Sequence, residues 1–156
     1  MRRLFCLFAM LLAAGCADTS IIPFAGYWTG EFKARPSDSK QKMRPEWVYK
    51  GYIQLYATGR KFKMHMESIA QIVDIDGTWT NKGEKAYLKA NKIEFDDRGG
   101  EIQRPSGVVP VPPEDVQTAY NRPLVFVLQP DKNTMIGLEM SIGPLIGHHV
   151  FTKGGE

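Results

Sequence analysis

The clearest pattern in this chain is the alternation of polar and apolar side chains in the stretch Lys61-Phe62-Lys63-Met64-His65-Met66-Glu67. Successive side chains of a β-strand point to opposite faces, so a period of two residues predicts a strand with one buried face. Phe62, Met64 and Met66 would then face inward, while the charged residues and His65 would face solvent. The preceding Thr58-Gly59-Arg60 is typical of a tight turn.

The same pattern recurs on both sides of this stretch. Further strands are predicted over residues 26–33, 47–57, 72–80, 84–88, 92–95, 124–129, 134–140 and 147–153. Most are joined by short turns rich in Gly, Pro, Asn and Asp, and regular helix-spaced segments are absent. The sequence therefore predicts an all-β fold, an antiparallel barrel of about eight strands, with a sandwich as the alternative.

The strand phases place a set of large apolar residues, rich in aromatic rings and methionine, inside the barrel. This set comprises Trp28, Phe32, Ile53, Leu55, Phe62, Met64, Met66, Val73, Ile75, Trp79, Leu88, Phe126, Leu128, Ile136, Leu138 and Met140. An eight-stranded barrel is just wide enough for side chains to fill it, which predicts a solid core. Flexible methionines can instead line a cavity that holds a ligand. Both interpretations stay open at this stage.

The segment 98–122 interrupts the series of strands. Four prolines exclude an inner strand there, and Pro113–Tyr120 suits one or two helical turns with acidic residues in the first turn. Loops of this length are uncommon unless they are functional or disordered. Its valines would cover the barrel mouth as a lid or be covered by a partner. The candidate ligand- or partner-binding residues are therefore Met64, Met66, Val108, Val109, Val111, Val116 and Tyr120.

The first residues of the chain have the features of an export signal. Arg2 and Arg3 precede an apolar run of 11 residues, shorter than the roughly 17–25 needed to span a bilayer. The following Gly15-Cys16 resembles the end of a bacterial lipoprotein signal. This resemblance implies a signal over residues 1–15, a lipid on Cys16 and a tether over 16–24 before the barrel domain of 25–156. Ala17 after the cysteine implies the outer membrane, with the domain facing the periplasm.

Charge and cysteine content exclude several classes of function. The formal charge is +3, and loss of Arg2 and Arg3 with the signal leaves +1, so no nucleic-acid partner is expected. Six basic residues between Lys33 and Lys50 fit a solvated loop, or a patch for anionic surfaces. Cys6 lies in the signal and Cys16 would carry the lipid. The domain therefore has no disulfide, no thiolate metal site and no cysteine nucleophile.

No constellation for catalysis or metal binding is predicted. The chain has no Gly-x-Ser-x-Gly, His-Glu-x-x-His or phosphate-binding glycine loop. Adjacent His148 and His149 would point to opposite faces and, with His65, are expected to be solvated or paired across strands. Asp74-x-Asp76-Gly77 lacks the further oxygen ligands of a calcium loop. We expect a protein that is not an enzyme and needs no cofactor.

Two glycine-aromatic motifs resemble those of a known family. Gly26-x-Trp28-x-Gly30, with Gly77-Thr78-Trp79-Thr80 and Tyr87-Leu88 further on, resembles the small lipocalin-like barrels of bacterial envelope lipoproteins. The region from Gly51 to Leu88 is similar to the N-terminal barrel of copper-resistance envelope lipoproteins. Those proteins carry a Cys-x-x-Cys pair that this chain lacks, which argues against a copper or redox role.

Two functions from different classes follow from these observations. The first is a membrane-tethered barrel that binds a small apolar or amphipathic ligand. The second is an interaction module of the cell envelope, such as an assembly factor, stress sensor or inhibitor. A cavity of a few hundred cubic ångströms at the barrel mouth would favour the first. A solid interior with an exposed apolar patch near Val108–Val116 would favour the second.

Overall fold

The computed structural model describes residues 23–97 and 110–154. Several sequence predictions fall outside these ranges: the signal over 1–15, the lipid on Cys16, all but the last two residues of the tether over 16–24, and the roles of Val108 and Val109. Within the described residues, no helix is both long and apolar enough to cross a membrane.

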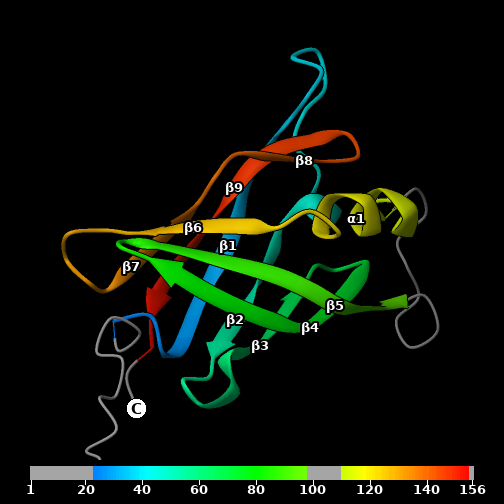
Figure 1. The fold of residues 1–156 in the computed structure, drawn as a ribbon. Coiled ribbons are helices and arrows are strands. Elements are labelled where there is room, and N and C mark those ends of the chain that lie inside the picture. The colour runs from blue at the N-terminus through cyan, green and yellow to red at the C-terminus, as the bar shows by residue number, and fades with distance from the viewer. Residues whose placement is uncertain (1–22, 98–109, 155–156) are drawn as a thin grey trace, which may run out of the picture.

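The strands form a single antiparallel barrel (Figure 1). Their bounds are β1 (Gly26–Pro36), β2 (Tyr49–Leu55), β3 (Lys61–Glu67), β4 (Gln71–Lys82), β5 (Lys85–Asp97), β6 (Leu124–Leu128), β7 (Thr134–Gly137), β8 (Met140–Ile142) and β9 (Leu145–Lys153). Neighbours in sequence pair from β1 to β7, and β9 closes the sheet by pairing with both β7 and β1. The short β8 pairs with β9 beyond the end of β7. β7 and β8 therefore follow one another along the same side of β9, and together they fill one of the eight strand positions of the barrel.

Among the residues that the structure describes, three short helices join the strands. They are η2 (Pro45–Trp47), η3 (Thr58–Arg60) and α1 (Pro113–Tyr120). The helix predicted over Pro113–Tyr120 is present with those bounds. The prediction of an all-β antiparallel barrel with one short α-helix is therefore confirmed, and the alternative of a sandwich is excluded by the closed sheet.

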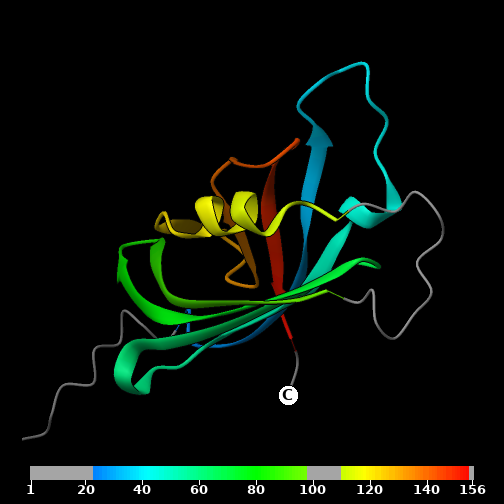
Figure 2. The same ribbon diagram turned by 90° about the vertical axis from the view of Figure 1, so that its right-hand side faces the viewer.

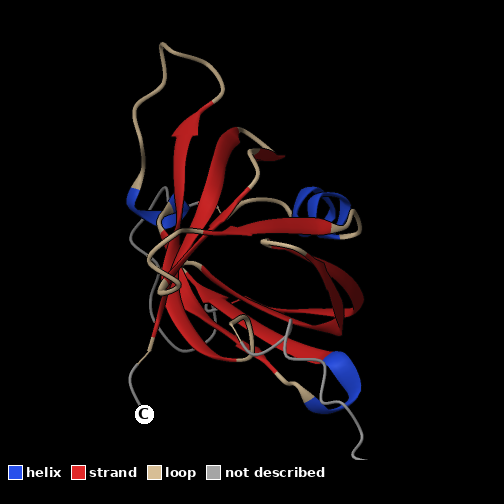
Figure 3. Ribbon diagram, turned by 60° about the vertical axis from the view of Figure 1, so that its left-hand side comes forward, coloured by secondary structure: helices blue, strands red, loops and turns tan. Residues whose placement is uncertain are grey.

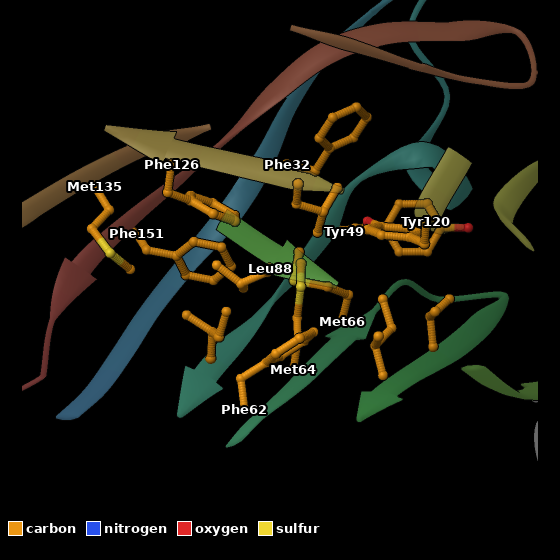
Figure 4. Close-up of a cluster of buried hydrophobic side chains, with 14 of the residues drawn as sticks. Phe32, Tyr49, Phe62, Met64, Met66, Leu88, Tyr120, Phe126, Met135 and Phe151 are labelled. Atoms are coloured by element: carbon orange, nitrogen blue, oxygen red, sulfur yellow. The ribbon is translucent and has the colours of Figure 1, made fainter. Parts of the chain in front are cut away.

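The interior of the barrel is lined as the alternation in residues 61–67 predicts. Phe62, Met64 and Met66 of β3 are each 1 % exposed, and Lys61, Lys63 and Glu67 face solvent. Figure 4 shows their side chains pointing towards Phe126 and Phe151 of the facing strands. Trp28, Trp79, Leu55 and Ile75 belong to the same buried cluster, so one core occupies the barrel.

Two facing glycines let neighbouring strands approach closely, β1 to β9 and β2 to β3. Gly30 of β1 lies opposite Gly51 of β2. A Cβ on Gly51 would lie 1.8 Å from the carbonyl oxygen of His65, and one on Gly30 would lie 1.9 Å from that of Val150. Any residue with a side chain at either position would force the neighbouring backbones apart. These glycines thus mark positions where the barrel requires close backbone approach.

The predicted break between residues 84–88 and 92–95 is wrong. The structure has one strand, β5, which pairs with β4 along its whole length. The register shifts between Asp76 and Gly77, which pair with Lys92 and Ala90. One extra residue, Asn91, is therefore accommodated in a β-bulge, and the strand continues beyond it. The interruption of alternation at this point indicates a bulge and not a turn.

The predicted inward placement of Ile136 and Leu138 is also wrong, whereas Met140 is partly buried and packs against the core as predicted. Met135 is fully buried, Leu138 is 55 % exposed and Ile136 is partly exposed. Met135 pairs with Phe151 and Gly137 pairs with Phe126. A Cβ on Gly137 would touch the Phe126 ring at 3.3 Å, so the absent side chain makes room for that ring. Packing against two phenylalanines therefore sets the phase of β7.

The antiparallel order gives the barrel two ends with different contents. At one end lie Pro23, where the described chain begins, the turns β2–β3, β4–β5 and β6–β7, and Gly154. We call this the tether end. The other end, the lid end, carries α1, the loop 37–48 and the β8–β9 turn. Figures 2 and 3 show α1 lying across the lid end.

Candidate functional site

Helix α1 closes the lid end because one of its faces is apolar. Val116, Ala119 and Tyr120 follow the i, i+3, i+4 spacing that puts side chains on one face of a helix, and all three are buried. Pro113 starts the helix, and the negative charges of Glu114 and Asp115 interact favourably with the positive N-terminal end of the helix dipole. Val111, just before the helix, is 1 % exposed.

The structure therefore brings five of the seven candidate binding residues to the interior or to the lid. Met64 and Met66 lie inside the wall at β3, and Val111, Val116 and Tyr120 are buried under or within the lid. Val108 and Val109 lie outside the described residues.

A buried polar pair joins the lid to the opposite wall. The hydroxyl of Tyr120 and Nε2 of His149 are 2.9 Å apart, and the imidazole tautomer decides which of the two donates. The rings of Phe32, Phe126 and Phe151 lie within 6.0 Å of the imidazole, centroid to centroid. Burial, with a smaller effect of His148, lowers the pKa of His149 to about 3. Burial also raises the pKa of Tyr120. Both groups are uncharged at neutral pH.

The expectation of solvated or cross-strand-paired histidines is therefore wrong for His149. It is 1 % exposed and contacts the lid. Its phase follows that of Phe151, two residues further along β9, which packs against Phe126. The prediction that His148 and His149 point to opposite faces is confirmed, since His148 is partly exposed. His65 pairs across strands as expected, with its Nδ1 2.7 Å from Oδ1 of Asp74.

A second polar connection holds the segment before α1. The hydroxyl of Tyr49 donates to Oε1 of Gln71 at 2.9 Å, and Nε2 of Gln71 donates to the carbonyl oxygen of Val111 at 3.4 Å. Burial raises the pKa of Tyr49 to about 12, with a hydrogen bond involving Ser68 acting in the opposite direction. Tyr49 is thus a neutral donor. The lid is held by this connection and by Tyr120.

A groove opens on the outer side of the lid, between α1 and β8. It has a volume of about 560 Å³. Its apolar lining includes Ala119, Leu124, Leu138 and Met140, and its charged residues are Asp115, Arg122 and Glu139. We call it the lid groove. A space of this size, with apolar walls and a few charged groups, suits one small amphipathic molecule.

The sequence interpretation missed the lid groove. It placed Leu138 and Met140 inside the barrel, and it treated residues 134–140 as one strand. The chain instead leaves β6 after Leu138, whose backbone N–H donates to the Val125 carbonyl at 2.9 Å, and then joins β9 as β8. The groove fills the gap between β6 and β8. The Gly137-Leu138-Glu139 sequence, where alternation fails, was the available signal.

Other clusters of polar residues show no arrangement for metal binding. In residues 23–97 and 110–154, no group of three or more His, Cys, Asp or Glu side chains lies close enough to hold a metal ion. Asp74, from the Asp74-x-Asp76-Gly77 motif, is paired with His65 on the outer wall.

Fold and site thus define a lidded antiparallel β-barrel with a mixed apolar and charged groove beside its lid. No family model and no curated protein matches the chain. A solved structure, that of Rv2717c from M. tuberculosis, is similar at 12 % identity with a TM-score of 0.38, covering 90 % of this chain and 98 % of that one. At this identity and score, the similarity carries no argument about function.

Proposed function

We propose that this protein is an envelope lipoprotein, not an enzyme, whose barrel binds a small amphipathic ligand in the lid groove. It would be anchored through lipid on Cys16 and lie in the outer membrane facing the periplasm. The observation that carries the proposal is the lid groove, with its volume of about 560 Å³ and its mixture of apolar walls and charged residues. No cofactor and no nucleic acid are part of this proposal.

The lining indicates how such a ligand would be held. Leu138 is 55 % exposed, so an apolar tail covering it would remove a large side chain from water. Arg122 is exposed and forms no ion pair with another described residue, and it would attract an anionic or polar head group. The lid itself stays in place, because the side chains of Val116 and Tyr120 on the inner face of α1 are buried.

Native mass spectrometry of protein extracted from its own membrane tests this function. We expect the wild type to retain a small-molecule adduct. Leu138→Arg should lower its occupancy about tenfold, because it replaces an apolar contact by a charge. Ile69→Arg is the matched control: Ile69 is 51 % exposed but lies in a different hollow. Absence of any adduct from wild type and control would contradict the proposal.

A specific observation favours the alternative of an envelope interaction module. Exposed aliphatic side chains gather at the lid end, at Met43, Val48, Ile69 and Leu138. Val48 and Ile69 share a hollow of about 280 Å³ with Pro45. If the native spectrum shows a bound protein that Ile69→Arg removes and Leu138→Arg does not, this surface binds a partner and the interaction module is the better description.

Lipidation is tested separately by Cys16→Ser. We expect this variant to incorporate no labelled fatty acid and to remain as an uncut precursor, because the thiol is the acceptor for the lipid. Cys6→Ser is the matched control, since Cys6 lies in the predicted signal and should leave labelling unchanged. Equal fatty-acid labelling of the Cys16→Ser protein and the wild type would refute the lipoprotein proposal.

A further inference from the structure

The tether end of the barrel is basic. The described residues there include two acidic residues, Glu84 and Asp131. They also include six basic ones: Arg60, Lys61, Lys82, Lys85, Lys132 and Lys153. Glu84 is already paired with Lys132 at 3.0 Å. Lys61, Lys82 and Lys85 are exposed and form no ion pair with another described residue. Three lysines of the turns therefore present unpaired positive charge.

The lid end has no such excess. The described residues there include at least as many acidic side chains as basic ones, and two of the basic ones are already paired: Arg35 with Glu139 and Arg44 with Glu46, both at 3.8 Å. Acidic residues also begin α1, at Glu114 and Asp115. The barrel is thus electrostatically polar along its axis, with positive charge at the end where the described chain begins.

Exposed apolar side chains are divided in the same way. At the tether end they are tyrosines: Tyr27 and Tyr56, each 42 % exposed, and Tyr87, 36 % exposed. At the lid end they are the aliphatic residues Met43, Val48, Ile69 and Leu138. Tyrosine is enriched at the boundary between membrane and water, because its ring enters the apolar layer while its hydroxyl stays in the polar layer.

We propose that the tether end docks on an anionic lipid surface through Lys61, Lys82 and Lys85, with Tyr27, Tyr56 and Tyr87 at the headgroup level. This inference rests on the proposed lipid on Cys16. Pro23 lies seven positions after Cys16, so the tether end stays within about 25 Å of the anchor. Electrostatic attraction acts within about 8 Å at physiological salt, which this reach allows. The lid groove then faces away from the membrane.

The expected effect follows from the number of lysines. Each basic residue near an anionic surface raises the equilibrium constant for binding about fivefold. Neutralising three should therefore lower the ratio of docked to undocked protein about a hundredfold. The test variant is Lys61→Gln/Lys82→Gln/Lys85→Gln. Its matched control, Lys40→Gln/Lys42→Gln/Lys50→Gln, removes the same charge from exposed lysines at the lid end.

The experiment uses the mature full-length protein, reconstituted into vesicles. A fluorophore is placed on Thr58→Cys at the tether end or on Ser141→Cys at the lid end, both exposed positions. A nitroxide on the lipid headgroups acts as quencher. With phosphatidylglycerol in the vesicles, we expect quenching at position 58 but not at 141. Quenching should be lost in the test variant, in pure phosphatidylcholine and in 1 M salt, and kept in the control variant.

Failure of docking and failure of lipidation give different results. A lipidated protein that stays with the vesicles while position 58 is not quenched overturns the docking proposal alone, as does equal quenching of the two lysine variants. A protein that carries no lipid is sedimented with the same vesicles. If this unlipidated protein binds the vesicles about a hundredfold more strongly with the wild-type lysines than in the test variant, the result would still support docking through the basic surface. Equal binding of the two would overturn the docking proposal. Burial of position 58 by another protein would also overturn it.

Discussion

Trp28→Ala is expected to lower the free energy of unfolding by about 3–5 kcal/mol, the usual cost of deleting a large buried aromatic side chain. Trp28 is fully buried between Ile53 of β2 and Lys153 of β9. Its indole Nε1 donates to the carbonyl oxygen of Phe24 at 2.8 Å, and Nζ of Lys153 lies 5.4 Å from the ring. The substitution thus removes packing at the tether end and leaves that carbonyl without its donor.

Urea unfolding followed by far-ultraviolet circular dichroism measures this loss. Tyr27→Ala is the matched control, because Tyr27 is the preceding residue of the same strand and points outward. Its effect should stay within about 0.5 kcal/mol, as for most surface substitutions. If the two variants lost equal stability, the phase of β1 described above would be wrong.

The stability of the barrel should fall steeply in mild acid because of His149. Burial holds its pKa at about 3, below the ordinary histidine pKa of 6.5 that applies to the unfolded chain. Between these values the unfolded chain binds a proton that the folded protein excludes. The contribution of His149 is therefore complete above pH 6.5 and is lost as the pH falls towards 3, by up to about 1.4 kcal/mol per pH unit.

The effect is isolated with the double variant Tyr120→Phe/His149→Phe. Replacing both partners by apolar rings avoids leaving one polar group buried and unpaired. Between pH 7 and pH 4, wild type should lose about 3 kcal/mol more than the double variant in urea unfolding, because only wild type has this histidine. Parallel pH profiles would show that His149 is not excluded from solvent in the folded protein.

The local pattern of each strand predicted much of the fold. In β3, apolar and polar residues alternate strictly, so only one orientation of the strand turns its apolar side chains towards the core. Phe62, Met64 and Met66 are inside as predicted. The same reasoning found Trp28 and Trp79. It also found α1, because Pro113 and the acidic residues after it are local signals for a helix start.

Prediction failed in strands that carry apolar side chains on both faces, because either face could then be the buried one. Thr134-Met135-Ile136-Gly137-Leu138 offers apolar side chains on either face. Its phase is decided by Phe126 and Phe151 on neighbouring strands, which need the space above Gly137 and beside Met135. In β5, the bulge opposite Gly77 depends on pairing with β4 and therefore cannot be read from β5 alone.

The sequence by itself determined that this chain forms an antiparallel barrel, which residues line most of it, and that a short helix interrupts the strands. These are properties of segments a few residues long, and their periodicity is visible locally. Only the tertiary structure decided how the lid is held and where the groove lies. Tyr120 meets His149 across 29 positions, and Gln71 meets Val111 across 40. Such contacts arise from closure of the sheet, which brings distant segments together and has no signature within any one of them.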